Sequence, residues 1–334
     1  MKKMRWGILS TANIGRKCVI PAILRGSEGV VAAIASRDAA RAAQVATDFG
    51  IPRSFGSYQE LIDDPNIDAI YNPLPNHLHV LWTVRALDAG KHVLCEKPIA
   101  LNATEAEAIV AARDRTGRSV IEAFMVRYHP QWQRIRALLK AGRIGELRLI
   151  QSSFLFRMLD PNNVRNQLAI GGGALYDVGC YPIVTARYAY EAEPERVIAL
   201  IDRDPALEVD RLTSGILAFP LGRQLVFSSS LQLASHQRVT LFGAEGRIEV
   251  MVPFTPREHL RCRIVIDSGA QQDGSSAEVE ELDPTDQYAL QCDSAARVFR
   301  GEHAQEFPIE DAIANMRVID ALYRSALSGV WERP

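Results

Sequence analysis

The chain has 334 residues, of which 47% are hydrophobic and 23% are charged, and its formal net charge at pH 7 is -2. A chain of this length exceeds the size at which one hydrophobic core usually stops growing, so we expect two domains. The balanced charge gives no broad attraction for nucleic acid or an anionic membrane, and Ser10 and Asn13 interrupt the first apolar segment, so we expect neither partner and predict chemistry on small molecules.

Cysteine usage bears on the compartment and on metal binding. The cysteines are scattered and none belongs to a CxxC pair; they are Cys18, Cys95, Cys180, Cys262 and Cys292. This spacing argues against a disulfide framework and against a zinc site. We therefore expect a cytoplasmic protein that holds no metal ion.

The first part of the chain, residues 1–124, alternates short apolar runs with helical stretches, which is typical of a doubly wound parallel sheet. Ser57 and Asn102 each precede a glutamate by three residues, a spacing that predicts two helix starts, and Gly90 is expected to end another helix in the left-handed conformation. The predicted buried strands are Arg5–Leu9, Val30–Ala35, Ala69–Tyr71, Val93–Cys95 and Val120–Ala123. We expect a dinucleotide-binding Rossmann domain.

Residues 125–334 have a different texture, with longer runs of alternating polarity. Alternation of this kind predicts an antiparallel sheet with one face packed and the other solvated or covered by a partner subunit. The predicted elements are a helix over Pro130–Ala141, strands over Leu147–Phe156, Gly215–Phe219 and Gln224–Leu233, and a helix over Glu310–Ser328. We expect an α+β domain with a large open, mainly antiparallel sheet, and a final helix (about 310–328) able to pack back on the first domain.

The turn after the first predicted strand has small residues where a dinucleotide fingerprint has glycines, namely Ser10, Ala12 and Gly15. Small residues let the backbone approach a pyrophosphate at a helix N-terminus. The alternative is an ordinary tight turn of a doubly wound fold. The candidate cofactor contacts in this turn are Ser10, Thr11, Ala12, Asn13 and Ile14.

The end of the second predicted strand bears on the choice of cofactor. NAD enzymes typically carry a carboxylate there for the ribose 2′-hydroxyl. This chain has Ser36 followed by Arg37, with Arg41 one helical turn further on, and these cations suit the 2′-phosphate of NADP. The alternative is that Asp38 caps the next helix and the arginines are solvated surface charges, with Asp38 still within reach of a 2′-hydroxyl. NADP(H) is therefore favoured, and NAD(H) is the alternative.

Lys97 follows the predicted strand Val93–Cys95, at the sheet edge where ligands of open α/β sheets bind. Pro98 restricts Lys97 to an extended conformation, and a cis bond before Pro98 would aim the ammonium into the crevice. Glu96 is a further candidate contact with the cofactor. The alternative is that Lys97 is an exposed cation paired with Glu96.

Two other segments carry candidate site residues. The loop after the strand Ala69–Tyr71 should also face the cofactor, and its candidates are Asn72, Pro73, Leu74, Asn76 and His79. In the second domain a glycine run precedes Asp177 and Tyr181, which lie four residues apart and share one face if the segment is helical. The alternative for that pair is a helix cap and a partly buried phenol.

Together, the turn at Ser10, the Glu96-Lys97-Pro98 segment and the glycine run before Asp177 resemble the Gfo/Idh/MocA oxidoreductases over essentially the whole chain. The branch that it resembles contains glucose-fructose oxidoreductase, NADP-dependent D-xylose dehydrogenase and dimeric dihydrodiol dehydrogenase. The resemblance implies that Lys97 is the catalytic lysine, Tyr181 the acid/base and Asp177 a substrate-orienting partner. It also implies a homodimer, or a dimer of dimers, built on the open sheet.

The expected activity is hydride transfer between NAD(P) and a CH–OH or C=O group of a sugar, polyol or diol. Substrate identity does not transfer within a fold, and the candidate lining residues are Arg127, Tyr128, Arg165 and Asn166. One alternative is a reductase of keto-sugars or nucleotide-activated keto-sugars, for which Arg165 and Arg187 are candidate phosphate ligands. Another is a non-catalytic, cofactor-sensing regulator, against which the joint presence of Lys97 and Tyr181 argues.

Overall fold

The computed structural model describes residues 2–271 and 273–334. The chain forms two compact units. The first contains the residues up to Met125 together with Asp286–Ile313, and the second contains Val126–Thr285 together with Ala314–Pro334. The main break between the units lies after Met125, one residue beyond the predicted boundary, and the segment Asp286–Ile313 belongs to the first unit and not to the second.

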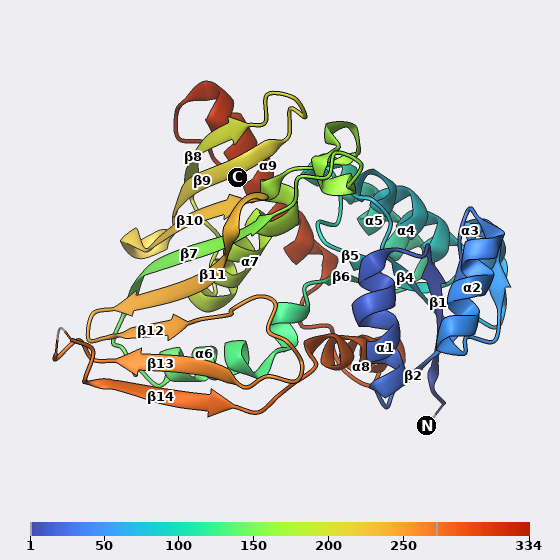
Figure 1. Cartoon of the computed structure of the whole chain (residues 1–334), viewed down its shortest axis with the longest axis horizontal. Coiled ribbons are helices and arrows are strands. Elements are labelled where there is room, and N and C mark those ends of the chain that lie inside the picture. Colours follow the sequence, from blue (N-terminus) through green and yellow to red (C-terminus); the bar gives the residue numbers. More distant parts are fainter. Residues whose placement is uncertain (1, 272) are drawn as a thin grey trace. The chain divides into compact units, whose positions relative to one another are not determined.

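The first unit is built on a parallel sheet of six strands in the order β3-β2-β1-β4-β5-β6 (Figure 1). The strands are β1 Met4–Leu9, β2 Gly29–Ala35, β3 Ser54–Phe55, β4 Ala69–Asn72, β5 His92–Glu96 and β6 Val120–Ala123. The strand order reverses between β1 and β4, and ligands of doubly wound sheets bind beyond the carboxyl ends at such a point. The predicted Rossmann sheet is confirmed.

Helices cover this sheet, with α1 beside α8 and α4 beside α5 (Figure 1). Their bounds are η1 Gly15–Val19, which continues into α1 Ile20–Arg25, then α2 Ala39–Phe49, α3 Tyr58–Asp63, η2 Asn76–Leu78, α4 His79–Asp88, α5 Ala103–Thr116 and α8 Gln287–Phe299. The predicted caps are confirmed, because Ser57 accepts from the Gln59 N–H and Asn102 from the Glu105 N–H. Gly90 has a φ of 77°, as expected after a helix end.

The position of α8 explains the corrected boundary. Its residues Cys292 and Phe299 are buried in the core of the first unit, which also contains Trp6 of β1. The Trp6 and Phe299 rings lie 5.8 Å apart between centroids. Burial of this apolar face joins α8 to a sheet whose first strand precedes it by more than 250 residues.

The second unit contains a sheet of eight strands in the order β14-β13-β12-β11-β7-β10-β9-β8, in which the β7–β10 pair is parallel and the other pairs are antiparallel. The strands are β7 Leu147–Arg157, β8 Arg196–Arg203, β9 Asp210–Ala218, β10 Gln224–Ser230, β11 Gln232–Gly243, β12 Arg247–Val250, β13 Cys262–Asp267 and β14 Ala277–Leu282. The large, mainly antiparallel sheet is confirmed.

One predicted strand is wrong. The run Gln224–Leu233 is not a single strand, because β10 ends at Ser230 and β11 begins at Gln232. These two strands pair with opposite edges of β7, so the chain passes across β7 at Leu231. Alternating polarity continues through such a crossing and therefore does not reveal it.

Helices α6 and α7 pack against this sheet. The helical segments of the second unit are η3 Met125–Tyr128, α6 Pro130–Lys140, η4 Val164–Asn166, η5 Leu168–Ile170, η6 Leu175–Gly179, α7 Cys180–Tyr190 and η7 Pro220–Gly222, and the last helix is α9 Ile309–Ser328. The predicted helices Pro130–Ala141 and Glu310–Ser328 are confirmed to within a residue. Among the described helices, none combines the length and the apolar character needed to cross a membrane.

Candidate active site

The turn after β1 contains Ser10, Thr11, Ala12, Asn13 and Ile14. Ser10 has a φ of 68°, a left-handed conformation that is usually left to glycine, and its Oγ accepts a hydrogen bond from the Ala12 N–H at 3.2 Å. Helical structure begins at Asn13. The N–H groups at this helix start, and the helix dipole, favour an anion. The turn therefore fits the pyrophosphate of a dinucleotide.

At the end of β2 the one carboxylate, Asp38, caps a helix, and two arginines are exposed. The Asp38 side chain caps α2 by accepting from the Arg41 N–H at 3.1 Å, and the Asp38 N–H donates to the Ser36 Oγ at 3.2 Å. Arg37 and Arg41 are exposed. Burial raises the pKa of the Tyr58 phenol, and the Arg37 guanidinium, which hydrogen-bonds to that phenol, opposes the rise.

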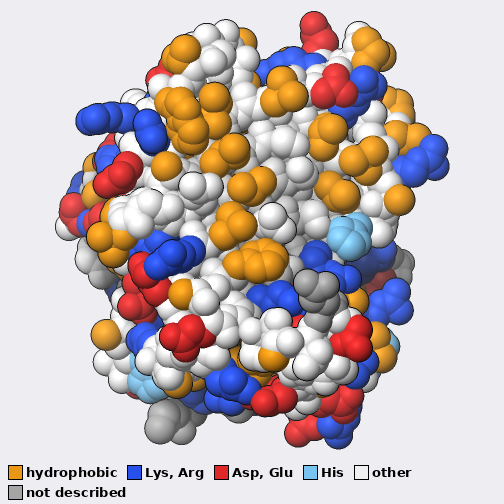
Figure 2. All heavy atoms as spheres, turned by 90° about the vertical axis from the view of Figure 1, so that its left-hand side faces the viewer, with side chains coloured by type: hydrophobic (Ala, Val, Ile, Leu, Met, Phe, Trp, Pro, Cys, Tyr) orange, Lys and Arg blue, Asp and Glu red, His pale blue; other side chains and the backbone are white. Residues whose placement is uncertain are grey.

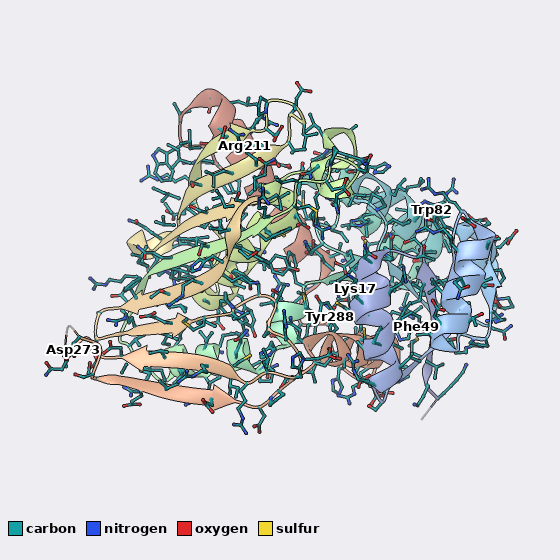
Figure 3. All side chains as sticks on the ribbon, in the orientation of Figure 1. Lys17, Phe49, Trp82, Arg211, Asp273 and Tyr288 are labelled. Carbon is teal, nitrogen blue, oxygen red and sulfur yellow. The ribbon has the colours of Figure 1, made fainter. Side chains whose placement is uncertain are left out.

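The Tyr58 ring, to whose hydroxyl Arg37 is hydrogen-bonded, belongs to an aromatic pair. The ring of Tyr58 meets the ring of Trp82 edge-on, with centroids 5.1 Å apart, and Trp82 projects from α4 (Figure 3). A guanidinium in this position next to the strand end suits the 2′-phosphate of NADP.

Lys97 is half-buried and directly follows β5, and the Lys97–Pro98 bond is cis, as the sequence suggested. The residues on both sides of Lys97 are fixed. The Glu96 carboxylate accepts from the Tyr71 hydroxyl at 2.7 Å, and the Ile99 N–H donates to the Glu122 carboxylate at 2.9 Å. Lys97 therefore sits on a loop whose path is set by neighbouring strands.

The loop after β4 is fixed from inside the unit. The Asn72 side chain is buried, donates to the His79 carbonyl at 3.1 Å and accepts from the Leu74 N–H at 3.3 Å. The ring nitrogens of His79 face two backbone carbonyls, Pro98 at 2.7 Å and Leu74 at 2.6 Å. Burial lowers the pKa of His79 to about 4. Pro73 is buried in the same loop, whereas Asn76 is half-buried.

In the second unit, the glycine run before Asp177 lets the backbone at Gly172 and Gly173 lie close to two other polar groups. A Cβ on Gly172 would lie 2.6 Å from the Arg165 carbonyl oxygen, and one on Gly173, whose φ is 129°, would lie 1.9 Å from the Asp210 carboxylate. The Gly173 N–H donates to the Arg165 carbonyl at 2.9 Å. Glycine is therefore required at both positions, and it brings the turn that carries Arg165 against the start of the helix.

Asp177 lies in the π-helical turn η6, and Tyr181 lies in the first turn of α7. The Asp177 carboxylate accepts a hydrogen bond from the Arg165 guanidinium at 2.7 Å, and the two side chains are 16% and 38% exposed. A predicted catalytic residue and a predicted substrate ligand are thus brought together as a partly exposed ion pair.

Tyr181 is only 5% exposed, and its ring packs against Phe154 and Phe254, with centroids 5.5 Å and 5.6 Å away. Aromatic packing on this scale restricts the ring to one orientation. The phenol is therefore held rigidly within the second unit.

The other three predicted substrate residues, Arg127, Tyr128 and Asn166, are less exposed than Arg165. Arg127 is buried and Tyr128 half-buried in η3. Asn166 is buried, and its amide donates to the carbonyls of Met158 at 3.0 Å and Asp160 at 2.8 Å. Asn166 thus holds the loop that carries Arg165.

Sequence reasoning missed Asp210, a buried carboxylate beneath the helix that carries Asp177. It accepts from the Leu175 N–H at 2.6 Å, from the Thr213 hydroxyl at 3.0 Å and from the Tyr323 hydroxyl at 3.0 Å. Burial raises the pKa of Asp210 to about 6. Asp210 begins a strand of alternating polarity, so the sequence contains no signal that distinguishes it from a surface carboxylate.

These features define a class of protein: a nicotinamide-dependent oxidoreductase with a dinucleotide-binding unit and a second unit built on a mainly antiparallel sheet. The family described as "Oxidoreductase family, NAD-binding Rossmann fold" matches residues 4–124, and the "GFO/IDH/MocA C-terminal domain" matches residues 132–249. The chain belongs to the Gfo/Idh/MocA oxidoreductase family.

Relatives match along nearly the whole chain. An oxidoreductase of Rhizobium meliloti without an assigned reaction is 48% identical, over 99% of both chains. A D-xylose 1-dehydrogenase (NADP(+)) of Haloferax volcanii is 37% identical, over 98% of both chains. A 3-ketoreductase of Actinomadura kijaniata, solved with NADP and TDP-benzene, has a TM-score of 0.91 and 30% identity, over 97% of this chain and 98% of that one. Structures of the same ketoreductase with a tyrosine replaced by phenylalanine, or a lysine by alanine, also match.

Proposed function

We propose that the protein is an NADP-preferring dehydrogenase that oxidises a CH–OH group of a sugar, polyol or diol and reduces the matching carbonyl in the reverse direction. The observation that carries this proposal is the position of Lys97, half-buried at the carboxyl edge of the parallel sheet, with Glu96 and Ile99 on either side of it held by hydrogen bonds. The similarity to a D-xylose dehydrogenase supports the substrate class.

A bound nicotinamide dinucleotide supplies the hydride acceptor, or the donor in the reverse direction. We propose that Tyr181 reacts as the phenolate, which the Lys97 ammonium stabilises, and that it becomes a neutral phenol when it takes the proton of the substrate hydroxyl. An ordinary phenol has a pKa near 10, so a phenol that acts as a base near neutral pH needs roughly 3–4 kcal/mol of stabilisation. An ammonium ~4 Å away at an effective dielectric of ~20 supplies about 4 kcal/mol.

The Arg165–Asp177 pair is proposed to orient the substrate. An ion pair that is partly exposed presents both a donor and an acceptor, which suits neighbouring hydroxyls of a polyol. Asp177, held by Arg165, would accept from one hydroxyl, and Arg165 would donate to another. Neither group has to change its protonation state during the reaction.

The second candidate function is reduction of a nucleotide-activated keto-sugar, which the similarity to the ketoreductase favours. Such a substrate requires cations for its diphosphate. Arg187, one of two candidates, is buried and makes a two-point ion pair with Glu193, at 2.6 Å and 2.7 Å. Arg165, the other, is paired with Asp177. These pairings favour an uncharged sugar or diol over an activated one.

A substrate panel tests the proposal. Aldoses, inositols, diols, keto-sugars and a nucleotide-activated keto-sugar are each supplied with NADP(H) and with NAD(H), and the absorbance of the reduced nicotinamide is followed. We expect turnover with an uncharged sugar or diol and a preference for NADP. Turnover with the activated keto-sugar alone would overturn the main proposal in favour of the second candidate.

We also propose that the open sheet of the second unit forms a homodimer, or a dimer of dimers. Leu200, Ile216 and Val226 project from β8, β9 and β10 with exposures of 78%, 37% and 36%, and Ile216 and Val226 are directly paired. The face in Figure 2, on the side where this sheet lies, shows apolar side chains in its upper and central part and mainly charged ones below. An apolar patch with a charged rim suits a self-complementary interface.

Sedimentation at micromolar concentration tests the dimer, because an interface of ordinary size persists there. A species of only 37.0 kDa would contradict it. We further propose that the protein works in the cytoplasm, since the described residues form no disulfide bond and four of the five cysteines are buried, which suits a reducing compartment.

A further inference from the structure

His79 joins two loops that leave the same edge of the parallel sheet. Leu74 is the second residue after β4, and Pro98 is the second residue after β5. The two strands are direct neighbours, with Asn72 paired to Cys95. The His79 ring lies between the loops and contacts the Leu74 carbonyl at 2.6 Å and the Pro98 carbonyl at 2.7 Å. One buried side chain thus sets the spacing of the two loops.

The contact between His79 and Pro98 is one of three contacts that hold the residues around Lys97. The residue before Lys97 is held by Tyr71, and the second residue after it is held by Glu122. His79 holds the carbonyl of the residue in between, directly after Lys97. The Lys97 ammonium also lies near enough to disfavour a second positive charge on His79. His79 therefore contacts the residue directly after Lys97, as Tyr71 contacts the residue directly before it.

The position of His79 leaves no free polar atom for a ligand. The residue is 1% exposed, and both of its ring nitrogens already face protein carbonyls. A neutral ring donates to one of these carbonyls and a cationic ring donates to both. A buried carbonyl that loses its donor is destabilised, so the loops would shift if the ring were replaced by a purely apolar one.

We propose that His79 is a positioning residue, which fixes the Lys97 ammonium by tying the Pro98 carbonyl to the loop at Leu74, and that it does not itself contact the cofactor. The inference rests on the proposed role of Lys97 in the reaction. In this proposal the reaction rate also depends on His79 of α4, although His79 touches neither the substrate nor the cofactor. Misplacement of a reacting group by about 1 Å can cost on the order of 100-fold in rate.

The test uses two substitutions of different chemistry. His79→Phe keeps an aromatic ring but has no donor, whereas His79→Gln keeps an amide N–H that can reach one carbonyl. We expect the Phe variant to lose about 10- to 100-fold in kcat with KM and the NADP dissociation constant within about threefold of the parent. The Gln variant should recover part of the loss.

His92→Phe is the matched control. His92 begins β5 at the end opposite Lys97, its ring stacks on Phe299 with centroids 4.9 Å apart, and its Nδ1 accepts from the Ser119 N–H at 3.0 Å. Replacing this ring should lower the melting temperature and leave kcat unchanged. A similar kcat loss at His92 and His79 would show a general effect of packing and would overturn the proposal.

A double-mutant cycle with Lys97→Met gives the decisive measurement. If His79 acts through Lys97, then His79→Phe should change kcat by less than about twofold in the Lys97→Met background. An undiminished loss in that background, or a loss of NADP affinity at unchanged kcat, would overturn the positioning role. Failure of the proposed function has a different signature, because Lys97→Met alone would then retain the parental turnover.

Discussion

The two side chains that we propose to react, Lys97 and Tyr181, are held in place by different physical means. Lys97 lies on a loop whose neighbours are tied by hydrogen bonds to three elements, through Tyr71, His79 and Glu122. Tyr181 lies on a helix whose start is tied to one buried carboxylate, Asp210. Several separate hydrogen bonds thus restrain the loop at Lys97, and we call them the Lys97 anchor. The helix at Tyr181 is restrained by charge-assisted hydrogen bonds to the single carboxylate of Asp210, which we call the Tyr181 anchor.

The two anchors also respond to pH in opposite directions. The pKa of His79 falls from 6.5 to about 4 on folding, so its contribution to stability is present above pH 6.5 and is lost as the pH falls toward 4. The pKa of Asp210 rises from 3.8 to about 6, so its contribution is greatest below pH 3.8 and is lost as the pH rises through 6. Acid thus lowers the contribution of His79 to the stability of the fold and removes the cost of burying a charge on Asp210.

The largest expected effect is that of Lys97→Met, which removes the charge and keeps much of the stem. Turnover should fall at least about 100-fold while NADP binding persists, because the pyrophosphate and ribose contacts are proposed to lie elsewhere. The residual rate should rise with pH further into the alkaline range than the parental rate does, since the phenol then ionises without help. Steady-state kinetics across pH, with NADP titration by fluorescence, measure both. Near-parental turnover with an unchanged pH profile would make Lys97 structural.

The second prediction concerns the glycine above the Tyr181 anchor. Gly173→Ala places a Cβ 1.9 Å from the Asp210 carboxylate at a φ of 129°. It should lower the free energy of unfolding by about 3 kcal/mol or more, from backbone strain and overpacking together, and should also reduce turnover.

Gly222→Ala is the control for that substitution. Gly222 has a φ of 74°, and no described atom lies within 4 Å of the added Cβ. Only backbone strain of about 1–2 kcal/mol is expected, without loss of turnover. Equal losses of stability in the two variants, measured by chemical denaturation, would show that Asp210 does not require the close approach.

The third prediction uses the pH dependence of the Tyr181 anchor. Asp210→Asn keeps an oxygen that can accept from Leu175 but does not titrate. Between pH 4 and pH 8 the parent should lose roughly 2.5 kcal/mol of stability relative to this variant, since the pKa of Asp210 rises from 3.8 to about 6 on folding. Denaturation curves at several pH values give the difference. Asp202→Asn, at an exposed carboxylate paired with Arg211, should show almost no such change. If the difference in unfolding free energy between the parent and Asp210→Asn did not change with pH, the raised pKa of the buried Asp210 would be contradicted.

The contrast between the two regions also shows what the sequence can predict. The alternating strands and helices that indicate a parallel sheet, and the turn at Ser10, were predictable because each signal lies in residues close together in the chain. Pro98 identified a bond for which the sequence analysis considered the cis form, and that bond is cis. The burial of Asp210, and the contacts of His79 with two separate loops, were not predictable. They depend on tertiary neighbours, and Tyr323 lies more than 100 residues from Asp210.

The candidate site shows the same limit. Asp177 and Arg165 were identified separately, and their pairing became visible only when Gly172 and Gly173 brought the turn against the helix. The alternative for Asp38, a helix cap, is the role that the structure shows. Competition between a local backbone partner and a ligand is decided by tertiary geometry, which sequence patterns do not contain.

The smallest expected effect lies outside both anchors, at Arg37. This side chain is exposed and hydrogen-bonds to Tyr58. If it binds the 2′-phosphate, then Arg37→Ala should cost roughly 1.5–3 kcal/mol of NADP affinity, the worth of a hydrogen bond to a charged group, and should leave NAD affinity nearly unchanged. Binding titrations with both cofactors measure the difference. Arg41→Ala, one helical turn further on, should have the same selectivity with a smaller loss. Because Arg37 touches neither anchor, kcat at saturating NADP should stay at the parental value, and equal losses of affinity for NADP and NAD would refute the assignment of the 2′-phosphate.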